Sequence, residues 1–265
     1  MHSNLKGFQK VDEEKYAGLS VKDEIRRRIW KLMNELGISR FPRPAAGRIP
    51  NFVGAERAAW RLIQQPEFHE ARVVKVNPDS PQALVRKETL LGGKILIMPT
   101  PRLRRGFIIL NPREIPKRSV ARASTIKGAL KYGRIISLND LPKVDLIVAG
   151  SVAVSRDGVR VGKGGGYSEL EYGILRELGK VDEKTPIFTT VHDIQIIDWA
   201  PSEPHDLIVD AIITPTKVIR IRRRAKRPAG IMWERITPNM LRDMPILLEL
   251  ALIKGIDLNQ TKPQQ

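Results

Sequence analysis

The order of apolar and polar residues predicts two helices near the start of the chain. From Ser20 to Leu36 apolar residues recur at helical spacing, with acidic residues in the first turn. Ser20 is typical of a helix N-cap, and Gly37 follows the last apolar position. A second helical pattern runs over residues 54–65 and ends before Pro66. We therefore expect two amphipathic helices here.

Beyond residue 66 short apolar runs alternate with helical patterns. They predict strands at 73–76, 94–98, 107–110, 145–149, 187–191 and 211–214, and helices at 82–91 and 167–178. The run 145–149 is apolar enough to be buried on both faces, as parallel strands are. Strands separated by helices are joined by right-handed crossovers. The sequence predicts an α/β fold, with a doubly wound, mainly parallel sheet and helices on both faces.

Three segments interrupt or follow this alternation. Residues 38–53 are rich in proline and arginine and are expected to form a loop or ordered arm. Residues 111–140 are rich in proline and charge, with weak periodicity, which predicts an irregular excursion or lid. We expect residues 1–219 to form one α/β domain, and residues 220–265 to form a basic linker with a C-terminal helical extension.

Composition narrows the class of protein. The 265 residues include no run of about 20 apolar positions, the length that a membrane span needs. Residues 1–15 carry charges where a secretory signal has its apolar run, so we expect a cytoplasmic protein. The absence of cysteine excludes disulfides and thiolate metal sites.

Lysine and arginine outnumber aspartate and glutamate by 46 to 29, a net charge of +17. The excess gathers in runs at 26–28, 102–105 and 220–227. Such a surplus attracts phosphates, those of a small cofactor or of RNA, although a generally basic proteome gives the same total. The run 220–227 is either a solvated linker to a packed helix or an RNA contact. An aromatic fraction of 5% argues against a stacking platform for single strands.

A glycine-rich loop follows the buried run 145–149 and a turn at Asp157-Gly158. It reads Gly162-Lys163-Gly164-Gly165-Gly166 and leads into the predicted helix 167–178. Glycines let backbone N–H groups converge on an anion, and a helix N-terminus adds partial positive charge. Arg160 and Lys163 can neutralise phosphate oxygens. The loop therefore has the chemistry of a phosphate cradle, with a flexible glycine turn as the alternative.

Two carboxylates could complete such a cradle with Mg²⁺. Glu169 lies just inside the helix after the loop, and Asp206 lies before the predicted strand 211–214. Mg²⁺ is commonly held by one or two carboxylates, with phosphates and waters filling its shell. The alternative is that Glu169 only favours its helix N-terminus and Asp206 caps a turn. His192 and His205 are isolated at predicted strand ends, and we assign neither a catalytic role.

From Lys22 to about Thr216 the chain carries separate motifs: Lys22-x-x-x-Arg26, the loop 162–169, Gln195, and His205-Asp206. In this order and spacing they resemble the 5-formyltetrahydrofolate cyclo-ligase family, or methenyltetrahydrofolate synthetases. Other segments resemble the divergent methenyltetrahydrofolate synthetase domain-containing branch: 48–52, 75–82, 99–104, 150–155, 190–193 and 214–216.

The resemblance implies a cyclo-ligase-like three-layer fold and an ATP- and Mg²⁺-dependent ring closure of 5-formyltetrahydrofolate or a related pterin. If the roles of the family's residues apply at the matching positions, Lys22 and Arg26 bind the nucleotide. The transferring phosphate is then surrounded by Arg160, Gly162, Lys163, Gly164, Gly165 and Gly166. Glu169 and Asp206 would hold Mg²⁺, and Lys163 and Tyr167 are the candidate catalytic residues. The alternative is a non-catalytic nucleotide- or RNA-binding protein derived from that fold.

Three departures from the family pattern bear on activity. Its Tyr-Tyr-Asp is here Tyr167-Ser168-Glu169, so one aromatic wall is lost. Its pterin-binding Glu-x-x-Thr corresponds to residues 80–83, which contain no carboxylate. Its tryptophan-containing pocket segment is replaced by residues 104–107. A site built to hydrogen-bond a polar ring loses heavily when its partners are absent, so nucleotide binding is the stronger expectation.

Overall fold

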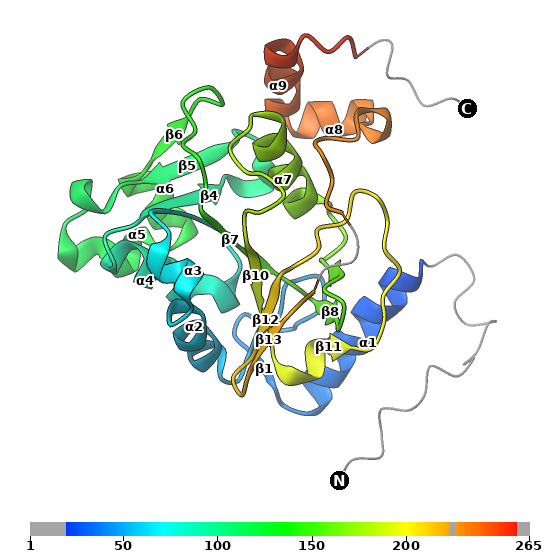
Figure 1. Cartoon of the computed structure of the whole chain (residues 1–265). Coiled ribbons are helices and arrows are strands. Elements are labelled where there is room, and N and C mark those ends of the chain that lie inside the picture. The colour runs from blue at the N-terminus through cyan, green and yellow to red at the C-terminus, as the bar shows by residue number, and fades with distance from the viewer. Residues whose placement is uncertain (1–19, 223–225, 259–265) are drawn as a thin grey trace.

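An eight-stranded sheet runs through the centre of the molecule (Figure 1). The computed structural model describes residues 20–222 and 226–258. Five neighbouring strands, in the order β12-β10-β7-β3-β4, are parallel. Three antiparallel strands extend the sheet, β13 at one edge and β5 then β6 at the other. The strands are β3 (Val73–Val76), β4 (Ile95–Pro99), β5 (Phe107–Leu110), β6 (Arg134–Ile136), β7 (Leu146–Gly150), β10 (Ile187–Thr190), β12 (Ala211–Ile213) and β13 (Val218–Arg220).

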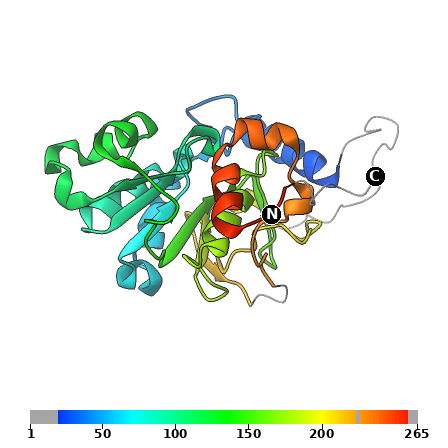
Figure 2. The same cartoon turned by 90° about the horizontal axis from the view of Figure 1, so that it is seen from above.

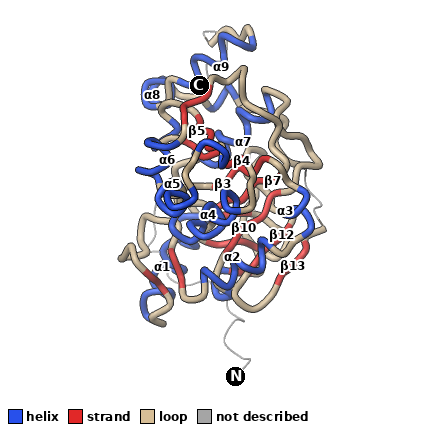
Figure 3. The backbone as a smooth tube through the Cα atoms, turned by 90° about the vertical axis from the view of Figure 1, so that its left-hand side faces the viewer, coloured by secondary structure: helices blue, strands red, loops and turns tan. Residues whose placement is uncertain are grey.

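Helices cover both faces of this sheet, as the strand pattern predicts (Figure 3). Successive residues of a strand point to opposite faces. Val74 packs in the cluster that contains Leu62 and Val85, and Val73 packs in the opposite cluster with Ile174 and Leu250. The helices are α1 (Val21–Glu35), α2 (Ala55–Ile63), α3 (Pro66–Glu70), α4 (Ala83–Leu91), α5 (Val120–Ala123), α6 (Ile126–Tyr132), α7 (Tyr167–Glu177), α8 (Pro238–Asp243) and α9 (Ile246–Lys254).

The strand order reverses at β3. The chain passes from β3 to β4 on one side and returns later to β7 on the other side. In open parallel sheets the crevice beyond the carboxyl ends of the strands at such a reversal is the usual place for a ligand. The fold therefore positions a site beside the residues that follow β3 and β7.

The segment 111–140 is not irregular, which corrects the expectation from its sequence. It contains short 3₁₀ turns, α5, α6 and the edge strand β6. Its helices are only four and seven residues long, so they show little periodicity, and they depend on burial of Val120, Ala123 and Ala129. Figure 2 shows this segment at the opposite end of the molecule from α1.

Several short strands were not predicted. The sequence predicts no strand after 211–214, but β12 is followed by a further strand, β13. In the arm, β1 (Ser39–Arg40) pairs with β2 (Asn51–Phe52). A small sheet has the order β11-β8-β9, formed by Ile196–Ile197, Ala153–Ser155 and Arg160–Val161. Two- and three-residue strands are too short for a period-two pattern to reveal.

The C-terminal helices pack on the main domain, next to α7 at the top of Figure 1. Leu247 and Leu250 of α9 are fully buried in the same cluster as Ile174 of α7. Among the basic residues before them, Arg220 pairs with Glu67, whereas Arg223 and Arg224 lie outside the described residues. Across the described ranges, no helix has the length and apolar character needed to cross a bilayer.

Among the described residues of the basic run 220–227, Arg227 is the buried one. Its side chain is fully buried, forms an ion pair with Asp210, and donates hydrogen bonds to the carbonyls of Ile208 and Thr185 at 2.9 and 2.8 Å. It thereby ties the segment before α8 to the strands of the main sheet.

Replacing Arg227 should destabilise the fold far more than replacing Arg220. Arg227→Ala removes the buried ion pair with Asp210 and the donor to two carbonyls, so the free energy of unfolding should fall by at least about 2 kcal/mol. Arg220→Ala, the control, removes a half-exposed ion pair, for which about 0–1 kcal/mol is expected. Urea unfolding followed by circular dichroism measures both, and equal losses would contradict the anchoring role of Arg227.

Candidate functional site

A pocket of about 670 Å³ opens beyond the carboxyl ends of β3 and β4. Its walls come from the start of α1, the arm, the loops after β3 and β4, the glycine loop with the start of α7, and the segment 203–206. Every site residue predicted from the sequence lines it: Lys22, Arg26, Arg160, Gly162, Lys163, Gly164, Gly165, Gly166, Tyr167, Glu169 and Asp206. Segments up to 184 residues apart thus meet where the strand order reverses.

The glycine loop lines the pocket, and its backbone N–H groups from Lys163 to Gly166 are not used by other described residues. Lys163 to Gly166 are exposed, and none of their N–H groups donates to another residue of the described ranges. Gly164 has φ +102° and Gly166, the N-cap of α7, has φ +64°, conformations that side chains with a Cβ rarely adopt. The loop is therefore held in a shape in which free amides and the N-terminus of α7 meet the pocket.

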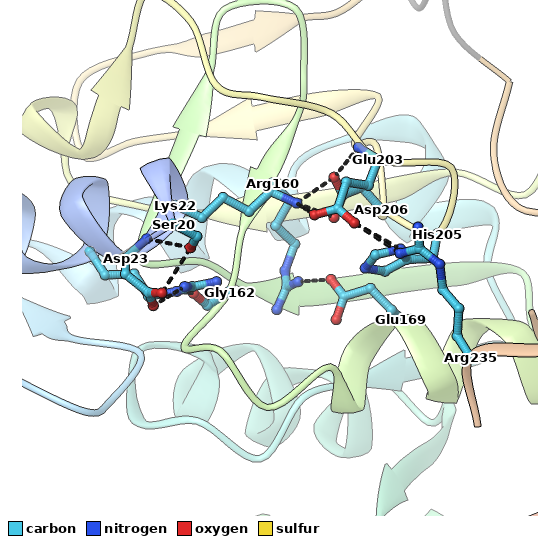
Figure 4. Close-up of polar contacts among 11 residues, drawn as sticks. Ser20, Lys22, Asp23, Arg160, Gly162, Glu169, Glu203, His205, Asp206 and Arg235 are labelled. Atoms are coloured by element: carbon cyan, nitrogen blue, oxygen red, sulfur yellow. Dashed lines mark hydrogen bonds and ion pairs between the residues drawn. The ribbon is translucent and has the colours of Figure 1, made fainter. Parts of the chain in front are cut away.

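Arg160 connects this loop to the sheet. Its side chain is 3% exposed. Nε donates to the carbonyl oxygen of Gly150 at 2.8 Å, one terminal nitrogen pairs with Glu169, and the other donates to Ser168 Oγ at 3.0 Å. Arg160 thus joins the end of β7 to the first turn of α7 (Figure 4).

Lys22 and Asp206 form the second buried pair of the pocket. Lys22 Nζ lies 2.7 and 2.6 Å from the two carboxylate oxygens of Asp206, and 3.5 Å from Glu203. Figure 4 shows the lysine reaching across from α1 to this carboxylate. Glu203 also accepts a hydrogen bond from Arg235, which, with Lys22, keeps the pKa of Glu203 below its usual value.

Arg26 joins α1 to the glycine loop. Its Nε donates to the carbonyl oxygen of Gly162 at 2.7 Å, and a terminal nitrogen pairs with Asp23 at 2.6 Å. Lys163 differs from these cations, because it makes no ion pair or side-chain hydrogen bond to the described residues. Lys163 is therefore an exposed cation that lines the pocket without a partner among the described residues, whereas Arg26 is held by Gly162 and Asp23.

The two predicted metal carboxylates lie in the same pocket, each beside a cation. Glu169 is paired with Arg160 and Asp206 with Lys22. Within the described part of the chain, no three acidic or histidine side chains gather closely enough to form a metal cage. A metal held here would take at most these few protein oxygens and fill its shell from a bound phosphate and water.

A buried polar network under the pocket was not predicted. Lys75 of β3 is 1% exposed and forms an ion pair with Glu171 of α7. Lys75 also donates to Asn77 Oδ1 at 2.7 Å, and Asn77 Nδ2 donates to Ser168 Oγ at 2.8 Å. Burial raises the pKa of Glu171, and the neighbouring Lys75 opposes that rise. The only sequence signal was a lysine inside an otherwise apolar strand.

The pocket contains a carboxylate that the sequence analysis did not assign. Asp79, one residue before the segment 80–83, lines the pocket and accepts no side-chain hydrogen bond from the described residues. Arg86 holds this turn by donating to the carbonyls of Asn77 and Asp79 at 2.7 and 2.8 Å. Burial lowers the pKa of Arg86 to about 10.

His192 and His205, the two histidines considered in the sequence, both form hydrogen bonds within the fold. His192 accepts a hydrogen bond from the N–H of Ile194 at the start of a 3₁₀ turn, and burial lowers its pKa. His205 lies 2.8 Å from Arg235, at the edge of the pocket.

The chain belongs to the 5-formyltetrahydrofolate cyclo-ligase family, whose model matches residues 19–215. A methenyltetrahydrofolate synthase domain-containing protein of Bos taurus is 44% identical over 241 residues, 89% of this chain and 63% of that protein. The protein of the same description in Homo sapiens is 40% identical over 242 residues, 90% of this chain and 63% of that protein. The chain therefore spans slightly less than two thirds of these relatives.

Solved structures agree on the fold. The NMR structure of Aquifex aeolicus 5,10-methenyltetrahydrofolate synthetase is 21% identical, with a TM-score of 0.50, and the match covers 78% of this chain and 95% of that one. The predicted α/β architecture and the resemblance to the cyclo-ligase family are confirmed.

Removing Lys75 should make stability depend on pH through Glu171. In Lys75→Met the buried carboxyl loses its cation, so its folded pKa rises further above the unfolded value. Such a group stabilises the fold below its unfolded pKa, and this contribution is lost as pH rises through the folded pKa. The free energy of unfolding should therefore fall more steeply from pH 5 to pH 8 than in the wild type, as measured by urea unfolding.

The double variant Lys75→Met/Glu171→Gln is the control for this experiment. It lacks the titrating carboxyl, so the added pH dependence of the single variant should disappear. A single variant whose slope equals that of the wild type would show that the pKa of Glu171 does not depend on Lys75.

Proposed function

We propose that the chain is an ATP- and Mg²⁺-dependent cyclo-ligase that closes 5-formyltetrahydrofolate, or a related pterin, to the 5,10-methenyl form. The observation that supports this most directly is the glycine loop, which has free amides, an adjoining helix N-terminus and an exposed lysine, all lining one pocket. This arrangement suits a phosphoryl group, because its oxygens accept hydrogen bonds from backbone N–H groups and from cations.

In this proposal the cations of the pocket have different tasks. Lys22 and Arg26 orient the nucleotide from α1, while Lys163 and Arg160 neutralise the phosphoryl group that is transferred. Lys163 is the group that can move with that phosphoryl, because no contact holds it. Tyr167, the first residue of α7, lies beside the loop and forms part of the wall around the reacting groups.

The oxygen ligands present fit Mg²⁺. Glu169 and Asp206 would hold it, with Arg160 and Lys22 shifting from the carboxylates toward phosphate oxygens. The ion would supply additional positive charge to the phosphates.

The reaction needs little covalent participation by the protein. The formyl oxygen attacks the terminal phosphorus of ATP, the bond from phosphorus to ADP breaks, and a phosphorylated formyl group is formed. The neighbouring amine then forms a bond to the formyl carbon, the bond from that carbon to the phosphorylated oxygen breaks, and phosphate leaves while the amine gives up its proton to water. A site made of cations and backbone donors accelerates such a reaction by positioning the reactants and by neutralising charge.

We propose that Asp79 supplies the protein carboxylate that binds the pterin ring. Asp79 lines the pocket and accepts no side-chain hydrogen bond from the described residues, so its carboxylate can accept from the N–H groups of a donor-rich ring. Asp79 would therefore restore the carboxylate that the sequence analysis found missing from residues 80–83.

MgATP binding should depend on Lys163. Lys163→Ala removes a charge-assisted contact to phosphate, so the affinity for MgATP should fall about tenfold or more, while the melting temperature stays unchanged because the side chain is exposed. Isothermal titration calorimetry measures the affinity. Lys184→Ala, an exposed lysine outside the pocket, is the control. Absence of heat and of thermal shift with wild-type protein and MgATP would refute the proposed nucleotide site.

Turnover should require ATP, 5-formyltetrahydrofolate and the protein together, and it is followed by the near-ultraviolet absorbance of the methenyl product. Asp79→Asn should raise the KM for the folate about tenfold, because an amide replaces a charged acceptor at the ring, and leave the affinity for MgATP unchanged. No product above background would contradict the activity. An unaltered KM would contradict only the assignment of Asp79.

A further inference from the structure

The hydroxyl oxygen of Ser168 accepts two hydrogen bonds, and its hydrogen is donated to none of the described residues. Ser168 is 6% exposed, lines the pocket and lies in the first turn of α7. Its oxygen accepts from Asn77 Nδ2 at 2.8 Å and from Arg160 at 3.0 Å. A serine hydroxyl has two acceptor positions and one hydrogen to donate.

The chemistry of the partners decides the direction of both hydrogen bonds. Lys75 can only donate, so the atom of Asn77 that faces it, 2.7 Å away, must be the amide oxygen. The NH₂ group of Asn77 therefore faces Ser168 and donates to it. Arg160 also can only donate. The ion pair of Lys75 with Glu171 thus sets the orientation of Asn77, and Asn77 sets that of Ser168.

The hydrogen of Ser168 has no acceptor among the residues that the structure describes. A buried donor that lacks a partner destabilises the structure, because its lost contact with water is not replaced. Ser168 lines the pocket, its hydroxyl oxygen contacts the guanidinium of Arg160, and the exposed glycine loop lines the same pocket. Accepting a hydrogen bond from a cation also makes a hydroxyl a stronger donor. The acceptor that fits this position is a negatively charged oxygen of a bound ligand.

We propose that Ser168 donates its hydroxyl hydrogen to an oxygen of the terminal phosphoryl group of ATP, and that Asn77 and Lys75 are positioning residues for it. This inference rests on the proposed function, because it takes the transferring phosphoryl to lie between Arg160 and the glycine loop. Ser168, at the position where the family motif has a second tyrosine, thus supplies a hydroxyl donor whose orientation is set, through Asn77, by the buried ion pair of Lys75 with Glu171.

The test compares nucleotides with and without the terminal phosphoryl. In Ser168→Ala the affinity for MgATP should fall about tenfold, while the affinity for MgADP changes less than about twofold. Both are measured by isothermal titration calorimetry at matched salt and Mg²⁺. Ser39→Ala removes a buried hydroxyl away from the pocket, whose hydrogen bond goes to Asn34 at 2.8 Å, and should alter neither affinity.

Asn77→Asp tests the positioning role with almost no change of shape. The aspartate keeps an acceptor for Lys75, but its second oxygen cannot donate to Ser168 and instead accepts the serine hydrogen. MgATP should then bind as weakly as in Ser168→Ala, and the double variant should be no weaker than either single variant. A merely structural role of Asn77 would reduce the affinities for both nucleotides alike.

Each outcome has a distinct meaning. Wild-type protein that binds no MgATP would overturn the proposed function and this inference with it. Wild-type binding combined with equal losses for MgATP and MgADP, or with no loss in Ser168→Ala, would overturn the role of Ser168 alone. Thermal melting of each variant, together with its MgADP affinity, shows that the fold is intact.

Discussion

The geometry of the pocket depends on one buried cation, Arg160. A charge taken out of water is tolerated only when it is paired and hydrogen-bonded. Arg160 meets this condition through Gly150, Ser168 and Glu169, which belong to the end of β7 and the first turn of α7. Because each of these contacts has a required direction, Arg160 links the strand, the glycine loop and the helix in a defined relative orientation.

This arrangement divides the charged groups of the pocket into two kinds. Lys22 with Asp206 and Arg160 with Glu169 neutralise each other, so they keep the pocket formed without a ligand. Lys163 and Asp79 are not held in this way. A cation and a carboxylate that have no ion-pair or side-chain hydrogen-bond partner among the described residues, within the same pocket, suit a ligand pair with a phosphate at one end and a donor-rich ring at the other.

Much of the site could be predicted from sequence, because its main parts are local. The loop 162–166 combines glycines, a lysine and a following helix within a few residues, and such chemistry is readable without tertiary contacts. Lys22 and Arg26 came only through the resemblance to the family. The network of Lys75, Asn77, Ser168 and Glu171 was missed, since its members are separated by up to 96 residues and are of types common on any surface.

The sequence by itself determined the α/β alternation, the buried central strands and the glycine loop, because these follow from periodicity and from backbone freedom within short windows. Tertiary structure decided which charges are paired and which are free. It also stabilised α5, α6 and the two- and three-residue strands, which their own propensities do not specify. The reason is that hydrogen-bond direction and desolvation act only between groups that packing has already brought into contact.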